Sequence, residues 1–123
     1  MSPRTAQVLE HMLEDVTDIQ QYTSGMDFAQ FLLDSKTRKA VSMSLLNIGE
    51  LIRHLPDKML RRHPEIPWIA LIGMRNITAH GYHQLNEAAI WETVTLNMPP
   101  LLNAIQQELT SADKAKPDSD ETL

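Results

Sequence analysis

The residues best suited to chemistry in this chain lie together between positions 75 and 82. Arg75, Asn76, His80 and Tyr82 follow a pattern of Arg, four residues, His, one residue and Tyr. A His side chain, with a pKa of about 6.5, both accepts and donates protons near neutral pH, and Arg carries a planar cation that fits phosphate oxygens. Together they suffice for metal-independent RNA cleavage. His80 would deprotonate a ribose 2′-hydroxyl, and Arg75 would stabilise the charge of the phosphorane.

The same residues also fit a purely structural role at a helix end. Arg75 would then pair with a carboxylate, and His80 would cap the last helical carbonyls. Glu50 is the candidate carboxylate that would orient Arg75, although an ordinary solvent-exposed carboxylate fits the sequence equally. His80 and His83 are three residues apart, but no carboxylate has matching spacing, so no metal site is predicted.

One helix must position these residues. Pro67 suits a first helical position, residues 68–74 are apolar on nearly every side, which is typical of a buried helix, and Gly81 is a natural stop. On an ideal helix Arg75 and His80 point about 140° apart. Either the helix end unwinds near Gly81, or a second copy of the helix supplies the missing group.

The rest of the chain also predicts helices. The first is expected from Thr5 to about Tyr22, and a second, short helix after Asp27 with a capping box to Gln30. A third helix would be capped by Ser35 or Thr37. A last long helix would begin at Asn86 and keep one apolar phase across two prolines, which indicates a kink. The expected buried stripes are Val8, Met12, Val16 and Ile19; Phe28, Phe31 and Leu32; Val41, Leu45, Ile48, Ile52 and Leu55; and Ile90, Val94, Met98, Leu101, Ile105 and Leu109.

These patterns predict an all-α fold, a bundle of four to five main helices with short extra helices. Residues 1–110 are expected to form one helical domain, and residues 111–123 a disordered polar tail. The chain has 123 residues and no Cys, which excludes a disulfide framework and a thiolate metal site. No segment has the length and apolarity of a membrane span or a signal peptide, so a soluble cytoplasmic protein is expected.

The net charge is −5, unusual for a protein that binds nucleic acid. The charge is unevenly distributed, however: residues 36–75 hold eight basic and three acidic residues, and the remainder holds three basic and thirteen acidic ones. The basic middle segment is either a local phosphate-binding surface or an ordinary solvated helix face.

The chain resembles the HepT-like HEPN proteins, ribonuclease toxins encoded beside MNT nucleotidyltransferase antitoxins. The resemblance covers roughly Val8 to Leu109. The signature RNITAHGY carries it, together with LEHMLEDVTDIQQYTSGMDFAQFL near the start, LLNIGELIRHLP in the middle, PW ahead of the signature and MPPLLNAI after it. The signature alone is a loose pattern, and the flanking blocks make it specific.

The resemblance implies a toxin of a toxin–antitoxin pair: a metal-independent endoribonuclease that needs no cofactor. Arg75 and His80 would be catalytic, and Asn76, Tyr82 and Glu50 would support them. The partner nucleotidyltransferase would neutralise the toxin by adding AMP to Tyr82. The alternatives are a non-catalytic HEPN module that holds a nucleotide or a protein partner, and a purely structural bundle.

A homodimer with the active cleft on its two-fold axis is also expected. In-line RNA cleavage needs both a base and an acid, whereas each chain offers one signature His. A symmetric interface repeats each group on both sides, which would also bring the separated Arg75 and His80 directions together. The family resemblance points to the same assembly.

Overall fold

The computed structural model describes the backbone of residues 1–80 and 87–115, and the side chains of residues 1–74 and 87–113. The long helices are α1 (Pro3–Tyr22), α3 (Ser35–Ile52), α5 (Trp68–His80) and α7 (Met98–Ala115). The short ones are α2 (Phe28–Leu33), α4 (Asp57–Arg61), α6 (Glu87–Glu92) and a π-helical segment, η2 (Thr93–Asn97). No strand occurs in these described ranges, and the predicted all-α class is confirmed.

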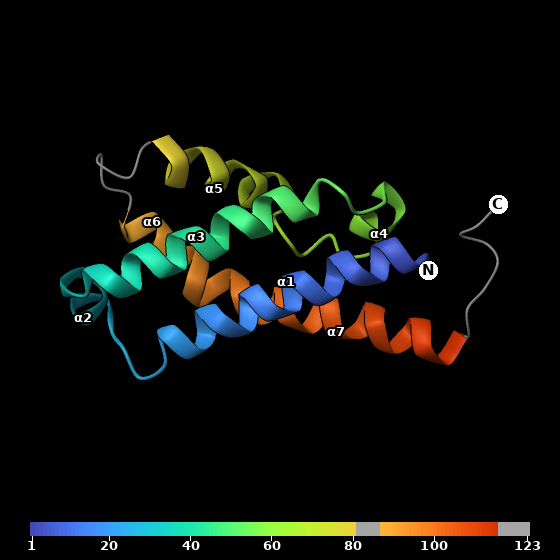
Figure 1. Cartoon of the computed structure of the whole chain (residues 1–123), viewed down its shortest axis with the longest axis horizontal. Coiled ribbons are helices and arrows are strands. Elements are labelled where there is room, and N and C mark those ends of the chain that lie inside the picture. The colour runs from blue at the N-terminus through green and yellow to red at the C-terminus, as the bar shows by residue number, and fades with distance from the viewer. Residues whose placement is uncertain (81–86, 116–123) are drawn as a thin grey trace.

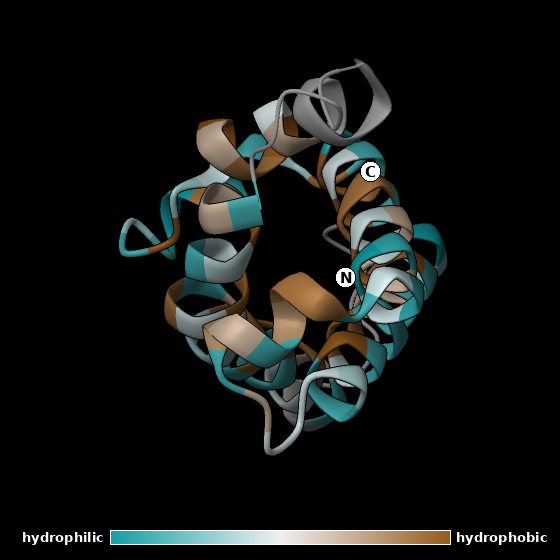
Figure 2. Cartoon of the chain, turned by 90° about the vertical axis from the view of Figure 1, so that its left-hand side faces the viewer, coloured by the Kyte–Doolittle hydropathy of each residue, from teal (hydrophilic) through white to brown (hydrophobic). Residues whose placement is uncertain are grey.

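The long helices pack as antiparallel neighbours. α3 packs against α1 on one side and α5 on the other, while α7 packs against α1. Figure 1 shows that α1 and α5 run in one direction and α3 and α7 in the other, so the start of α3 and the end of α5 lie at the same end of the bundle, with α2 and α6. Seen from that end, hydrophobic and hydrophilic segments alternate along the ribbons, as expected of amphipathic helices (Figure 2).

The predicted apolar stripes form the core. All four stripe residues of α1 are buried, as are Val41, Leu45, Ile48, Ile52 and Leu55, and Ile90, Val94, Met98, Leu101 and Ile105. Phe31 is fully buried and stacks on Trp91, with ring centroids 5.0 Å apart. Leu32, expected in the core, is 41% exposed, because the six-residue helix α2 covers the bundle with only one narrow face.

Helix capping follows the sequence with two differences. Asp27 and Gln30 form the expected capping box at the start of α2. Ser2, rather than Thr5, caps α1, and its hydroxyl accepts from the Thr5 amide. Asp34, rather than Ser35 or Thr37, caps α3, because its carboxylate accepts from the Thr37 amide at 3.0 Å. A carboxylate at the N-cap satisfies a free amide and favours the helix dipole.

Where a kink near Pro99 and Pro100 is predicted, the structure has a π-helical turn, η2, which ends two residues before Pro99. A proline ring clashes with the carbonyl four residues earlier, and a widened turn is one way to relieve that clash without breaking the helix. α7 then continues to Ala115, beyond the expected start of the tail at residue 111. Residues 116–123 and Asn86 lie outside the described residues.

Candidate functional site

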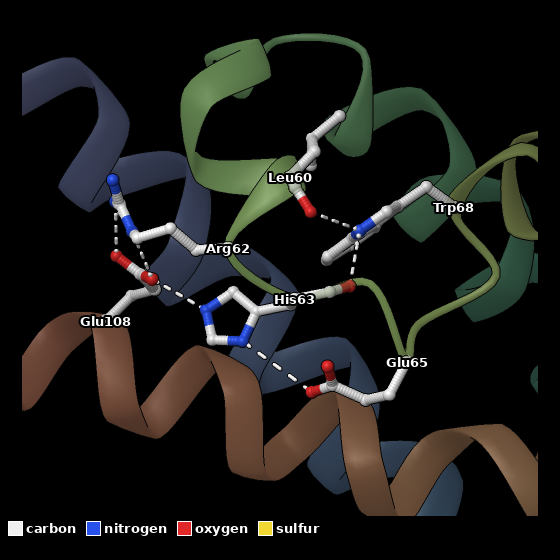
Figure 3. Close-up of polar contacts among 6 residues, drawn as sticks. All are labelled: Leu60, Arg62, His63, Glu65, Trp68 and Glu108. Carbon is white, nitrogen blue, oxygen red and sulfur yellow. Dashed lines mark hydrogen bonds and ion pairs between the residues drawn. The ribbon is translucent and has the colours of Figure 1, made fainter.

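The start of α5, the helix that carries the signature, is fixed by Trp68. Its indole N–H donates to the carbonyl oxygens of Leu60, at 3.0 Å, and His63, at 3.1 Å (Figure 3). Leu60 belongs to α4 and His63 to the turn that follows it. This turn therefore sets where α5 begins, and with it the position of everything further along that helix.

The same turn is tied to α7 by an ionic cluster (Figure 3). Arg62 donates to both carboxylate oxygens of Glu108, at 3.1 and 2.8 Å. The Nε2 atom of His63 lies 2.6 Å from Glu108 Oε2, and its Nδ1 atom lies 3.7 Å from Glu65. His63 is only 5% exposed, so its imidazole is a buried member of this cluster. Nothing in the spacing of the residues indicates a partner 45 residues away.

This cluster shifts the acidity of Glu108. Burial raises the pKa of that carboxyl, but the hydrogen bonds and charges of Arg62 and His63 outweigh burial, and the net pKa is lowered. Glu108 is therefore an ionised, hydrogen-bonded carboxylate near neutral pH. The cluster lies at the opposite end of α5 from the signature, so we assign it a positioning role.

The middle of α5 is covered on one side only. Leu71 and Met74 face the core, and the hydroxyl of Thr93 on η2 lies 3.8 Å from the sulfur of Met74. On the other side Ile69 is 86% exposed, and a Cβ placed on Gly73 would meet nothing within 4 Å. The expectation that α5 is buried all round therefore fails for the single chain, which leaves an apolar stripe of this helix open.

The signature lies at the far end of α5. The backbone is α-helical through Arg75, Asn76 and His80, but their side chains lie outside the described residues, as does all of Tyr82. Helical geometry up to His80 keeps positions 75 and 80 about 140° apart, so unwinding before His80 does not bring them together. Positions 69 and 80 lie about 20° apart around the axis, three turns along. The signature His80 therefore shares the stripe of the exposed Ile69.

An acidic pocket of about 500 Å³ opens between α1 and α3. Its lining residues are His11, Glu14, Asp15 and Asp18 from α1, and Asn47, Glu50 and Leu51 from α3. Burial raises the pKa of Asp15, and a hydrogen bond to Asn47 partly offsets this. The sequence showed an acidic side of α1 and an isolated Glu50, but only the packing of α1 on α3 brings these groups into one pocket.

Glu50 is half-buried on α3, which packs directly against α5. Its predicted partnership with Arg75 involves a side chain outside the described residues. Within the described residues, no group of three or more His, Asp or Glu side chains is arranged to hold a metal ion. In the same ranges, no helix is both long and apolar enough to cross a membrane.

The chain belongs to the ribonuclease HepT-like family, whose sequence model matches residues 12–108. The match spans α1 to α7 and includes the signature. No solved structure matches the chain significantly.

The chain is also similar to several proteins whose names describe them as ribonucleases. The chain is 35% identical to the "Putative RNase MJ0127" of Methanocaldococcus jannaschii, over 80% of this chain and 82% of that protein. It is 37% identical to the "Probable ribonuclease HepT" of Thermococcus cleftensis, over 76% of this chain and 84% of that protein. It is also 32% identical to the "Putative RNase TTE0752" of Caldanaerobacter subterraneus subsp. tengcongensis, over 82% of this chain and 90% of that protein.

Proposed function

We propose that this protein is a metal-independent endoribonuclease in which Arg75 and His80 do the chemistry. Membership of a ribonuclease family supports the reaction class. The observation that carries the assignment is that α5 holds the Arg-x4-His-x-Tyr signature at its end, with position 80 on the stripe of the exposed Ile69. Position 80 therefore lies on the side of α5 that the rest of the chain leaves uncovered, where a substrate or a second copy of the helix can reach it.

The reaction follows from these residue types. His80 takes the proton of a ribose 2′-hydroxyl, and the 2′-oxygen attacks the adjacent phosphorus. The bond from phosphorus to the 5′-oxygen breaks, an acid protonates that oxygen, and a 2′,3′-cyclic phosphate remains. Arg75 neutralises the charge that develops on the phosphoryl oxygens. Asn76 and Tyr82 assist in holding the phosphate, and Glu50 on the neighbouring helix orients Arg75.

We infer that the active form is a homodimer built across α5. The exposed Ile69 and the open space at Gly73 provide an apolar stripe that a second α5 can approach closely. Two copies of this helix would place two His80 residues at one seam, one available as base and the other as acid. The helical backbone up to His80 favours this arrangement over unwinding of the helix end.

The test is cleavage of total RNA by purified protein in the presence of EDTA. We expect cleavage by the wild type and a loss of about 10²–10⁴-fold in rate for His80→Ala and for Arg75→Ala, with folding retained. Wild-type rates in both variants, with contaminating ribonuclease excluded, would overturn the assignment. RNA binding without cleavage by the wild type would instead favour the non-catalytic binding module.

We further propose that the protein is the toxin of a toxin–antitoxin pair, controlled at Tyr82 by a nucleotidyltransferase. An added AMP would place negative charge and bulk next to Arg75 and His80, and would repel the RNA phosphate. Coexpression with the neighbouring nucleotidyltransferase should give AMP-sized mass increments that are absent in Tyr82→Phe. Equal increments in that variant would place the modification elsewhere.

A further inference from the structure

Apart from Arg75 of the signature, the fold divides the basic residues of the middle segment into two groups. α3 has 18 residues and is therefore about 27 Å long. Lys36, Arg38 and Lys39 lie in its first turn. The other group follows its last turn: Arg53, Lys58, Arg61 and Arg62. The two groups therefore lie at opposite ends of the bundle and cannot act as one phosphate-binding surface.

Only the first group lies at the signature end. α3 and α5 pack as antiparallel neighbours, so the first turn of α3 lies at the end of the bundle where α5 finishes. An ion pair of 3.9 Å between Arg38 and Glu87 ties this turn to the start of α6. Glu87 follows His80, the last residue of α5, by seven residues.

Lys36 and Lys39 are the available cations of this group. Both are exposed, and they are three residues apart, so they lie on one face of α3. Arg38, in contrast, is engaged with Glu87 and with the carbonyl oxygen of Leu32. Neither lysine forms an ion pair with a residue whose side chain the structure describes.

The acidic pocket disfavours one path that RNA could take to the end of α5. Glu14, Asp15 and Asp18 line the α1–α3 groove, and like charges repel the phosphates of RNA. A strand that reaches the end of α5 is therefore disfavoured along that groove and favoured over the first turn of α3.

We propose that Lys36 and Lys39 bind the RNA backbone beside the phosphate that is cleaved. The inference rests on the proposed ribonuclease function, and it adds a substrate-binding site outside the signature. Lysine acts here as a point charge for phosphate, without base contacts. The two lysines would therefore strengthen the binding of RNA to the same extent whatever its base sequence.

The test measures binding and cleavage separately. A 2′-O-methyl RNA oligonucleotide lacks the attacking hydroxyl, so its affinity can be measured by fluorescence anisotropy without turnover. The variant is Lys36→Gln/Lys39→Gln, and the matched control is Lys58→Gln/Arg61→Gln, which removes the same charge at the opposite end of α3. Thermal melting verifies the folding of both.

A plot of the logarithm of the association constant for RNA against the logarithm of the salt concentration has a negative slope. Each phosphate contact to a single strand contributes about 0.7 to its magnitude, so we expect the loss of two contacts in the Lys36/Lys39 variant to reduce the magnitude by about 1.4. At 0.1 M salt this corresponds to a loss of roughly 25-fold in affinity, and the KM for RNA cleavage should rise with little change in kcat. The control should match the wild type.

Equal affinity and salt slope in the two double variants would overturn the inference and leave the proposed function intact. The inference would also be overturned if the Lys36/Lys39 variant lost only its binding to the nucleotidyltransferase, because the lysines would then form a protein interface. A wild type that binds the oligonucleotide through these lysines but cleaves no RNA would overturn the proposed function alone.

Discussion

His63 and Glu108 illustrate how two polar side chains are retained in the interior of a small bundle. Each is at most 9% exposed. Glu108 accepts two hydrogen bonds from the more exposed Arg62, and its Oε2 atom lies 2.6 Å from Nε2 of His63. Removal of one member of such a group leaves the rest buried and unsatisfied. Because the turn that carries Arg62 and His63 also holds Trp68, the cluster links α7 to the start of α5.

Glu108→Gln tests this link. The pKa of Glu108 is lowered in the folded protein, so its stabilising contribution is present above the unfolded pKa and is lost as pH falls through the lower folded pKa. We expect the variant to lose about 2 kcal/mol of unfolding free energy at pH 7, and less in acid. Urea unfolding at several pH values measures this.

The exposed neighbouring substitution Arg61→Gln serves as the control, and should change stability little. A constant difference between Glu108→Gln and wild type down to acid pH would contradict an ionised Glu108 as the source of the effect.

Among the helices, α5 is held in position by two contacts, one at its first turn and one next to the signature. Trp68 anchors its first turn through two carbonyl acceptors, and η2 presses Thr93 against Met74, one residue before Arg75. The π-helical turn thus does more than accommodate Pro99 and Pro100. It places a buried hydroxyl against the segment that carries the signature.

Trp68→Phe should loosen the start of α5 while keeping much of the apolar contact. The carbonyl oxygens of Leu60 and His63 would lose a common donor, at a cost of about 1 kcal/mol. Amide hydrogen exchange in the first turn of α5 should then become faster. Trp91→Phe is the matched control, because Trp91 stacks on Phe28 and Phe31 and has no comparable indole hydrogen bond among the described residues. Equal acceleration in both variants would contradict a specific anchor.

In the whole molecule, the exposed apolar side of α5 at Ile69 and Gly73 is the proposed contact surface for a second copy of the chain. Ile69→Asp places a charge in the proposed seam, where burial of an unpaired carboxylate is strongly unfavourable. Light scattering at micromolar concentration should show a dimer for the wild type and a monomer for the variant, which should also lose RNA cleavage.

Leu33→Asp is the control, because Leu33 is 87% exposed on α2, away from the stripe. A monomeric wild type with full ribonuclease activity would rule out the shared cleft. Within the dimer, one His80→Ala chain paired with a wild-type chain should be severely impaired, since the base and the acid come from different copies.

The helices and most of the core could be predicted from the sequence. Apolar spacing placed the buried stripes correctly in α1, α3 and the α6–α7 region, and the Asp27–Gln30 capping box was read directly, because these features depend on neighbours within a few residues. The signature and its flanking blocks likewise identified the family before any geometry was known.

Which face of each helix packs against which neighbour became clear from the packed structure. It showed that α5 is covered on one side and open at Ile69, although its sequence is apolar nearly all round. It buried His63 against Glu108, collected the acidic residues of α1 and α3 into one pocket, and divided one basic segment between two ends of the bundle. All of these depend on groups far apart in the chain, and helical periodicity carries no information about which helix packs against which.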